Sequence, residues 1–241
     1  MPKEKIAGVE ILKDGHFQMT NPWKKPVVGW QPTSQGVGGL YNPMGFAALR
    51  VVNTKLVDGV MVPLYDQPLI VENLGSIVIA QLGDRVGLVK NFRMIGERLL
   101  PDAGAEYIRR LESEKRWEEL LSTLGQWSWE APRGLAPGKG EEDMKSFILK
   151  TAKIEAAEEA GFKIEDARIA GRVNVNTTFF PHAQYVVHAR IDSIGKAKPE
   201  ELELLGATRL FTMRELRELN DAGEFVDGLT LAALALCGLG I

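Results

Sequence analysis

The sequence predicts a protein of the α/β class. Two apolar, β-branched runs flank a Gly-Asp pair between residues 76 and 92, which indicates an antiparallel hairpin. Apolar residues at helical spacing follow in residues 101–124, and again before a cluster of glutamates near residue 155. With 241 residues, 45% of them hydrophobic, the chain can bury the core of one large domain or of one domain with an extension.

The composition excludes several classes of function. The 29 basic and 32 acidic residues give a net charge of −3, so no overall field attracts nucleic acid or an anionic membrane. The single cysteine, Cys237, excludes an internal disulfide and a cysteine-cluster zinc site, and its apolar surroundings indicate a buried structural thiol. That apolar run is too short to span a bilayer, and Glu10 and Asp14 interrupt any apolar signal segment after Met1. We therefore expect a cytoplasmic protein without nucleic-acid or membrane partners.

Residues 1–64 are predicted to form an extension of strands and loops before a domain that covers residues 65–241. Short strand-like pieces, such as residues 9–12 and 46–52, lie among prolines and glycines. The G-V-G-G-L stretch from Gly36 does not indicate a dinucleotide-binding loop. Its third glycine is missing, no clear strand precedes it, and no helical pattern follows.

The hairpin signal places an arginine at the end of a strand. Residues 76–81 and 86–92 are the predicted strands, and Gly83 between them supplies the positive φ of a tight turn. Arg93 follows the second strand. A rigid strand can hold a guanidinium against a phosphate, whose oxygens match its fork of donors. A solvated surface arginine is the simpler alternative.

The next elements lead to the glutamate cluster. Residues 101–124 are a predicted helix for core or subunit packing, and residues 126–134 a short strand that ends in a Pro-Arg-Gly turn. After a loop rich in turn residues at 135–140, Asp143 is a plausible N-cap. The helix that it begins is expected to run on to the glutamates.

Three glutamates share one helical face in the stretch A-K-I-E-A-A-E-E-A-G-F. Glu155, Glu158 and Glu159 lie three and four residues apart, where like charges repel by about a few tenths of a kcal/mol per pair. A hard divalent cation such as Mg²⁺ or Mn²⁺ would relieve this repulsion, since it prefers carboxylate oxygens and keeps waters that a phosphate can replace. The alternative, which the helix alone favours, is a solvated face that ends at Gly161.

These motifs, in this order, resemble the Nudix hydrolases, in particular the ADP-ribose pyrophosphatase branch. The family box reads G-x5-E-x7-R-E-U-x-E-E-x-G-U, where U is a bulky apolar residue. Its end matches Glu155, Glu158, Glu159, Gly161 and Phe162. Asn91-Phe92-Arg93 resembles the family's Q-[YF]-R, and W-E-A-P-R-G resembles its W-E-x-P-x-G. That signature starts the box at Gly134, whereas strict spacing starts it at Gly140. The resemblance runs from about residue 76 to the closing G-E-F-V-D-G-L-T-L-A-A-L.

The resemblance implies a Nudix fold, in which a mixed, mostly antiparallel sheet packs between helices. The implied activity is Mg²⁺- or Mn²⁺-dependent hydrolysis of a nucleoside diphosphate linked to another moiety, such as ADP-ribose or a nucleotide sugar. The catalytic and metal-binding residues that it implies are Glu155, Glu158 and Glu159, with the carbonyl of Arg133 as a further metal ligand. The substrate-binding residues that it implies are Arg93, Arg133 and His182. Relatives in this branch pair through N-terminal strands, which implies a homodimer.

The sequence departs from the family box at three positions. Ile154 replaces the box arginine, and the small Ala156 replaces the bulky residue after the first glutamate of the cluster. The early glutamate falls on Ser146, and Glu141 or Glu142 can substitute only if an expanded segment brings one of them back. In the family the arginine holds the carboxylates in place. The alternative function is therefore a catalytically impaired nucleotide-binding or regulatory module, and a purely structural subunit is a third interpretation.

The remaining elements follow from local signals. Residues 168–175 and 183–191 are predicted strands. In the branch that the sequence resembles, the catalytic base often lies on a later loop. Glu200, Glu201 and Glu203 are the candidates here, and spacing does not choose among them. His188 alternates within a strand, which favours a structural role. Thr212 and Glu215 form a capping box for a helix that Gly223 ends. The last helix, at 230–236, is apolar all round and is expected to be buried.

Overall fold

The structure is a computed structural model. It describes the backbone of residues 4–11, 19–20, 26–27, 31–32, 40–41, 46–58, 60–72, 75–94, 101–116, 119, 125–135, 143–176, 180, 183–198, 205–225 and 227–240. Side chains are described mainly from residue 75 onward. The chain divides into two compact units. One comprises Met1–Ser76, Gly134–Thr151 and Arg172–Tyr185, and the other comprises Ile77–Arg133, Ala152–Gly171 and Val186–Ile241.

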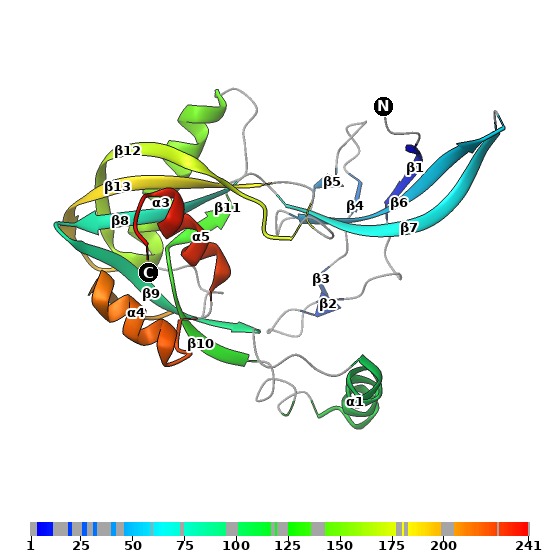
Figure 1. The fold of residues 1–241 in the computed structure, drawn as a ribbon. Helices are drawn as coiled ribbons and strands as arrows, with labels where there is room; N and C mark the ends of the chain where they lie inside the picture. Colours follow the sequence, from blue (N-terminus) through cyan, green and yellow to red (C-terminus); the bar gives the residue numbers. More distant parts are fainter. Residues whose placement is uncertain are drawn as a thin grey trace. The chain divides into compact units, whose positions relative to one another are not determined.

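The first unit contains a three-stranded antiparallel sheet in the order β1-β6-β7 (Figure 1). Its strands are β1 (Glu4–Ile11), β6 (Phe46–Val57) and β7 (Val60–Glu72). Two short antiparallel pairs join β2 (Met19–Thr20) to β3 (Pro26–Val27), and β4 (Gln31–Pro32) to β5 (Leu40–Tyr41). The long hairpin β6–β7 turns at Asp58, whose φ is 48°. β7 crosses residue 64, and the domain division at that residue remains a prediction.

A seven-stranded sheet carries the rest of the fold, in the order β10-β9-β8-β13-β12, with β11 on β8 and β14 on β9. Its strands are β8 (Gly75–Leu82), β9 (Arg85–Met94), β10 (Gly125–Glu130), β11 (Arg133–Leu135), β12 (Phe162–Val173), β13 (Gln184–Ile194) and β14 (Leu205–Thr212). β9 pairs antiparallel with β8, β10 and β14. The predicted hairpin is confirmed, since Leu82 pairs with Arg85 across a two-residue turn in which Gly83 has a φ of 62°.

The connection from β10 to β11 is inserted between β8 and β9. Beside β9, Glu130 at the end of β10 pairs with Val89. Two residues later, the carbonyl of Pro132 accepts a hydrogen bond of 2.8 Å from the N–H of Val78 in β8. Residues 130–133 therefore pass from one strand to the other at the place where β8 and β9 diverge. This insertion positions two charged side chains of the candidate site.

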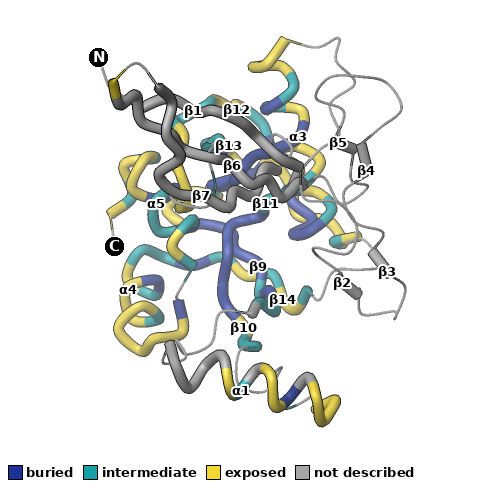
Figure 2. Tube along the Cα trace, turned by 90° about the vertical axis from the view of Figure 1, so that its right-hand side faces the viewer, coloured by how far each residue is buried: buried dark blue, intermediate teal, exposed yellow. Residues whose placement is uncertain are grey.

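Two of the described helices, α3 and α5, lie on opposite faces of this sheet. The helices are α1 (Pro101–Glu114), α3 (Met144–Ala160), α4 (Met213–Asp221) and α5 (Gly228–Leu236). In both views α3 and α5 lie on opposite sides of the sheet (Figures 1 and 2). The residues Gly75–Ala80 of β8 are all buried, as expected for a strand that is covered on both faces. The core includes Ile77, Ile79, Leu88, Phe162, Val186, Phe211 and Leu234.

The helix caps follow local sequence signals. Oδ1 of Asp143 accepts hydrogen bonds from the N–H groups of Lys145 and Ser146, at 3.0 and 3.1 Å, so Asp143 caps α3 as predicted. Gly161 ends α3 with a φ of 71°, and a Cβ there would lie 2.4 Å from the carbonyl oxygen of Gly195. The predicted capping box of Thr212 and Glu215 is also present at the start of α4.

Several predicted element bounds are wrong. The helix that begins at Pro101 ends at Glu114 instead of running to residue 124, because Lys115 takes a left-handed φ of 56°. The Pro-Arg-Gly sequence leads into strand β11 instead of forming a turn. β12 begins directly after the Gly161 cap, six residues before the predicted start at 168.

The last helix is less buried than its composition suggests. Leu236 in α5 is 43% exposed, and only the side facing the sheet, with Thr230, Ala233 and Leu234, is buried. Cys237 caps this helix and is half-buried, and burial raises the pKa of its thiol to about 11. This pKa disfavours thiolate chemistry. None of the helices described for this chain has the length and apolarity needed to span a bilayer.

Candidate functional site

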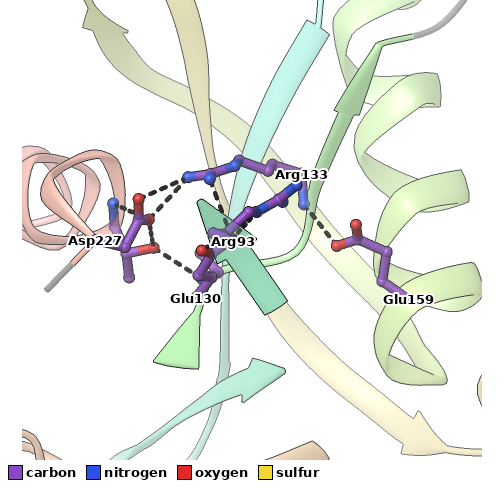
Figure 3. Close-up of polar contacts among 7 residues, drawn as sticks. Arg93, Glu130, Arg133, Glu159 and Asp227 are labelled. Carbon is purple, nitrogen blue, oxygen red and sulfur yellow. Dashed lines mark hydrogen bonds and ion pairs between the residues drawn. The ribbon is translucent and has the colours of Figure 1, made fainter. Parts of the chain in front are cut away.

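The candidate site lies in the second unit, around the connection from β10 to β11 (Figure 3). Glu130 ends β10 and Arg133 begins β11. Arg93 lies near the end of β9, and Glu159 lies in the last turn of α3. Asp227 is the N-cap of α5. Two helices and three strands thus bring five charged residues together.

Arg93 forms an ion pair with Glu130 along the strand direction. Nε of Arg93 donates to Oε2 and Oε1 of Glu130 at 3.0 and 3.3 Å. The residue opposite Arg93 is Gln126, whereas Glu130 lies opposite Val89, four residues along the ladder. Four residues of strand span roughly 13 Å, so both side chains extend along the strands to meet. The side chain of Arg93 is 36% exposed and that of Glu130 only 1%.

The extended arginine passes a buried polar pair. Asn91 and Ser128 are opposite each other in the same ladder and share the face of Arg93 and Glu130, because alternate residues of a strand lie on one side. Asn91 is 5% exposed and Ser128 is fully buried. Within the described part of the chain, the hydroxyl of Ser128 has no hydrogen-bond partner. This face of the sheet is therefore polar beneath the Arg93 side chain.

Arg133 bridges two carboxylates. Its Nη1 donates to Oδ1 and Oδ2 of Asp227 at 2.9 and 2.8 Å, and its Nη2 lies 3.1 Å from Oε2 of Glu130. The side chain of Arg133 is 20% exposed and that of Asp227 is 11% exposed. The planar guanidinium carries enough donors to serve both acids at once, which an ammonium group does less well.

Asp227 is itself held by the first turn of α5. The N–H and the hydroxyl of Thr230 both donate to Oδ2 of Asp227, the former at 2.9 Å. Oγ1 of Thr230 accepts the N–H of Ala131 at 2.8 Å. Thr230 is fully buried and Ala131 is 1% exposed. The start of α5 is therefore bonded both to the β10–β11 connection and to Arg133.

Glu159 meets the same connection from α3. Its Oε2 accepts the backbone N–H of Arg133 at 2.9 Å, and the residue is only 3% exposed. Glu155, one turn earlier, is half-buried. Glu158 is also half-buried and lines a separate hollow of about 590 Å³, whose other lining residues include Lys153 and Lys198. The three glutamates therefore occupy unlike environments.

Burial and the charges of the site compete, and the pKa values of two of its acids shift in opposite directions. Burial raises the pKa of Glu130, although Arg133 and Arg93 oppose this effect. Burial alone would also raise the pKa of Asp227, but Arg133 and the hydrogen bonds from Thr230 outweigh it, so the pKa is lowered. Burial acts to lower the pKa of Arg133, and its two acidic partners raise it overall. Arg133 is therefore a fixed cation.

The structure links Arg93 to Arg133 through Glu130, and Arg133 to Glu159 through its backbone N–H, while their roles in a site stay predictions. Glu130 and Asp227 were missed. Glu130 stands in the W-E-A-P-R-G motif, and Asp227 stands three residues before Thr230 at the start of an apolar run, which is an N-cap signal. Neither signal reveals that Arg133 joins the two acids.

Other candidate residues lie outside the described part of the chain. These are Gly140, Glu141, Glu142, His182, Glu200, Glu201 and Glu203. Ser146 is exposed in the first turn of α3, and Ile154, in place of the box arginine, is 40% exposed. The assignment of the catalytic base to Glu200, Glu201 or Glu203 stays a prediction.

His188 has the structural role that was predicted for it. Its Nδ1 accepts Nη2–H of Arg168 at 2.9 Å, so the ring is neutral at that nitrogen and Nε2–H donates to Oε1 of Gln81. Burial and the charge of Arg168 lower the pKa of His188. These hydrogen bonds join β13 to β12 and to β8. Their residues are remote in sequence from Arg133.

Glu155 and Glu159 carry the carboxylate oxygens that a hard divalent cation prefers as ligands. Glu155 and Glu159 offer carboxylate oxygens one helical turn apart, and Mg²⁺ is usually bound by only one or two carboxylates together with water and substrate phosphate. Among the described residues, no group of three or more histidine, cysteine, aspartate or glutamate side chains is arranged to hold a metal. Binding of a divalent metal by Glu155 and Glu159 therefore remains a prediction.

Comparison with protein families finds no matching family, and comparison with curated proteins finds no matching relative. Among solved structures, the chain is similar to one described as the crystal structure of ADP compounds hydrolase. The TM-score is 0.55 at 14% sequence identity, and the match covers 99% of this chain and 94% of the other. At this identity the similarity shows the fold alone. It confirms the predicted Nudix-like arrangement of a mostly antiparallel sheet with helices.

Proposed function

We propose that the protein is a divalent-metal-dependent hydrolase that cleaves a nucleoside diphosphate linked to another moiety, such as ADP-ribose or a nucleotide sugar. The observation that carries this proposal is the buried Glu159 carboxylate, bonded to the N–H of Arg133 at 2.9 Å beside the Arg93 ion pair. Acidic groups and arginines are thereby gathered on one fold, as a metal-bound diphosphate requires. The fold similarity to an ADP compounds hydrolase supports the same conclusion.

Each residue has a defined role in this proposal. Glu155 and Glu159, with the carbonyl of Arg133, would hold Mg²⁺ or Mn²⁺, and Glu158 would assist only by turning out of the hollow that it lines with Lys153 and Lys198. The metal would supply charge neutralisation for the diphosphate and acidify a bound water. Hydrolysis forms a bond from the water oxygen to one phosphorus and breaks the bridging P–O bond, which gives two monophosphates. Arg93 and Arg133 offset charge on the phosphate oxygens, and His182 is a further candidate contact.

Arg93 must exchange partners to act on a phosphate. Its guanidinium is bonded to Glu130 in the structure, and its side chain is 36% exposed. A phosphate presents acceptors of the same geometry as a carboxylate, so it competes for the same fork of donors. Because Glu130 keeps Arg133 as a second partner, at 3.1 Å, loss of Arg93 does not leave Glu130 without a cation.

The test is hydrolysis of ADP-ribose with Mg²⁺ or Mn²⁺, followed by detection of AMP. Glu159→Gln keeps the size of the side chain and removes its charge, and we expect it to lower kcat by about 100-fold or more if Glu159 is a metal ligand. Glu218→Gln is the matched control, since Glu218 is exposed on α4. Turnover that is equal in the wild type and Glu159→Gln would remove the proposed site. A panel of nucleoside diphosphate derivatives then identifies the leaving group.

A second candidate function is a nucleotide-binding or regulatory module without turnover. Ile154 favours it, since a 40% exposed isoleucine supplies no charge to the glutamates on its helix. This alternative predicts calorimetric binding of ADP-ribose without release of AMP. It also predicts that Ile154→Arg would create turnover. The hydrolase proposal predicts turnover in the wild type.

We further propose that two copies pair through the N-terminal strands. The first unit presents β1, β6 and β7 as a small three-stranded sheet, and strand edges pair readily with a second chain. Light scattering of the full chain should give the mass of a dimer. A monomeric mass at micromolar concentration would contradict this assembly and leave the hydrolase proposal standing.

A further inference from the structure

Glu159 is held by a strand. The helix that carries it has Ile154 where the Nudix box has an arginine, and that side chain is 40% exposed. Glu159 is nevertheless 3% exposed, and its Oε2 accepts the N–H of Arg133 from the start of β11. The position of the Glu159 carboxylate therefore depends on where the backbone of Arg133 lies.

The backbone of Arg133 belongs to β11, which pairs with β8, and the Arg133 side chain gives this segment a further attachment. Both oxygens of Asp227 accept Nη1 of Arg133, at 2.9 and 2.8 Å. Asp227 does not move freely, because Thr230 donates two hydrogen bonds to it and Thr230 also accepts the N–H of Ala131. This sequence of contacts runs from the first turn of α5 through Arg133 to the last turn of α3 (Figure 3).

We propose that Asp227 is a positioning residue for Glu159. Asp227, at the N-terminus of α5, binds the guanidinium of Arg133. It thereby fixes the position of the Arg133 N–H group, to which the Glu159 carboxylate is bonded. Asp227 acts through Arg133 and has no role in binding the nucleotide. This inference rests on the proposed function only where it concerns metal affinity and turnover. The coupling from Asp227 to the Arg133 N–H is a separate physical claim.

The competing explanation is that Asp227 serves only to cap α5. Asparagine is as good an N-cap as aspartate, because its side-chain oxygen accepts the same backbone N–H groups. Asp227→Asn therefore keeps the cap and removes the charge that clamps Arg133. Asp143→Asn is the matched control. Asp143 also caps a helix, is exposed, and bonds backbone N–H groups of its own first turn.

The direct test is hydrogen exchange of the Arg133 amide, measured by NMR in the full chain. We expect Asp227→Asn to speed exchange of this amide by about tenfold or more, because its bond to Glu159 is no longer held in register. Asp143→Asn should leave it unchanged. Exchange of the Arg133 amide within twofold of the wild type, in a folded Asp227→Asn variant, would overturn the proposal. If that variant fails to fold, Arg133→Lys takes its place, since lysine keeps the charge but loses the fork.

Kinetics separate this role from a merely structural one. We expect Asp227→Asn to raise the Kd for Mn²⁺, measured by the EPR signal of the free ion, by about tenfold, the usual loss when a supporting contact of a metal ligand is removed. The kcat should fall with it. A wild type without AMP release refutes the hydrolase but leaves the amide-exchange result to decide the positioning. If the wild type is active and Asp227→Asn has the same Mn²⁺ affinity and kcat, the positioning role of Asp227 is wrong and the hydrolase proposal stands.

Discussion

Two acidic regions meet at Arg133, and they differ in how their charge is compensated. On the strand side, Glu130 and Asp227 share the Arg133 guanidinium, and Glu130 also bonds Arg93. On the helix side, Glu159 accepts a backbone N–H, and the side chain one residue before Glu155 is the uncharged Ile154. The strand region thus has its cations built in. In the helix region, Glu159 meets this connection through a backbone amide instead of a guanidinium.

The largest effect should come from removing the shared cation. Arg133→Met removes the cation bonded to the largely buried Asp227 and leaves Glu130 with Arg93, and breaking a buried pair of this kind costs about 3–5 kcal/mol of unfolding free energy. Urea denaturation at pH 7 measures it. The matched control is Arg190→Met, because Arg190 also bridges two carboxylates, Glu165 and Asp166, but on the surface. Equal midpoints for the two variants would show that burial at Arg133 contributes nothing.

A smaller effect is expected at the end of the helix region. Gly161 has a φ of 71°, and a Cβ there would meet the carbonyl oxygen of Gly195 at 2.4 Å. Backbone cannot move aside as a flexible side chain can, so Gly161→Ala should cost about 1–3 kcal/mol from the left-handed conformation, with the contact adding to it. Gly223→Ala is the control, since Gly223 has a φ of 72° and open space. A lower melting temperature for Gly223→Ala than for Gly161→Ala would contradict the close contact at Gly161.

The helix region was predictable because its signals are local. The cap at Asp143, the stop at Gly161 and the spacing of the glutamates all depend on neighbours within a few residues. The hairpin around Gly83 is local in the same sense. The end of α1 at Lys115 was missed, since a left-handed lysine leaves no mark in the apolar pattern. Exposure of Leu236 was missed because composition does not say which side of a helix faces the sheet.

The strand region was not predictable, because its contacts join distant parts of the chain. Arg133 and Asp227 are 94 residues apart, and Arg93 and Glu130 are 37 apart. The sequence suggested Arg93 and Arg133 as cations for a phosphate. It gave no sign that carboxylates already occupy both guanidiniums, since that follows only from inserting residues 130–133 between β8 and β9.

Acid should weaken the strand region selectively. The pKa of Asp227 is lowered from its ordinary value of 3.8, so its contribution to stability is complete above that value and is lost as the pH falls below it toward the folded-state pKa. Asp227→Asn lacks this contribution at every pH. The difference in unfolding free energy between wild type and Asp227→Asn should therefore shrink below about pH 4. A difference that is constant from pH 7 to pH 3, by urea denaturation, would mean that the carboxylate is not charge-paired.

The smallest effect on stability should come from adding a cation to the helix region. Ile154 is 40% exposed, so Ile154→Arg should change the unfolding free energy by no more than about 0.5 kcal/mol. Its guanidinium would be one residue from Glu155 and four from Glu158, at the helical spacing that favours opposite charges. If the helix region needs support for its carboxylates, Mn²⁺ affinity should rise by up to about tenfold. Ile154→Gln, of similar polarity but uncharged, separates charge from polarity. A lower Mn²⁺ affinity in Ile154→Arg than in Ile154→Gln would show that the new cation competes with the metal. Arg133 would then already supply the support that the box arginine would give.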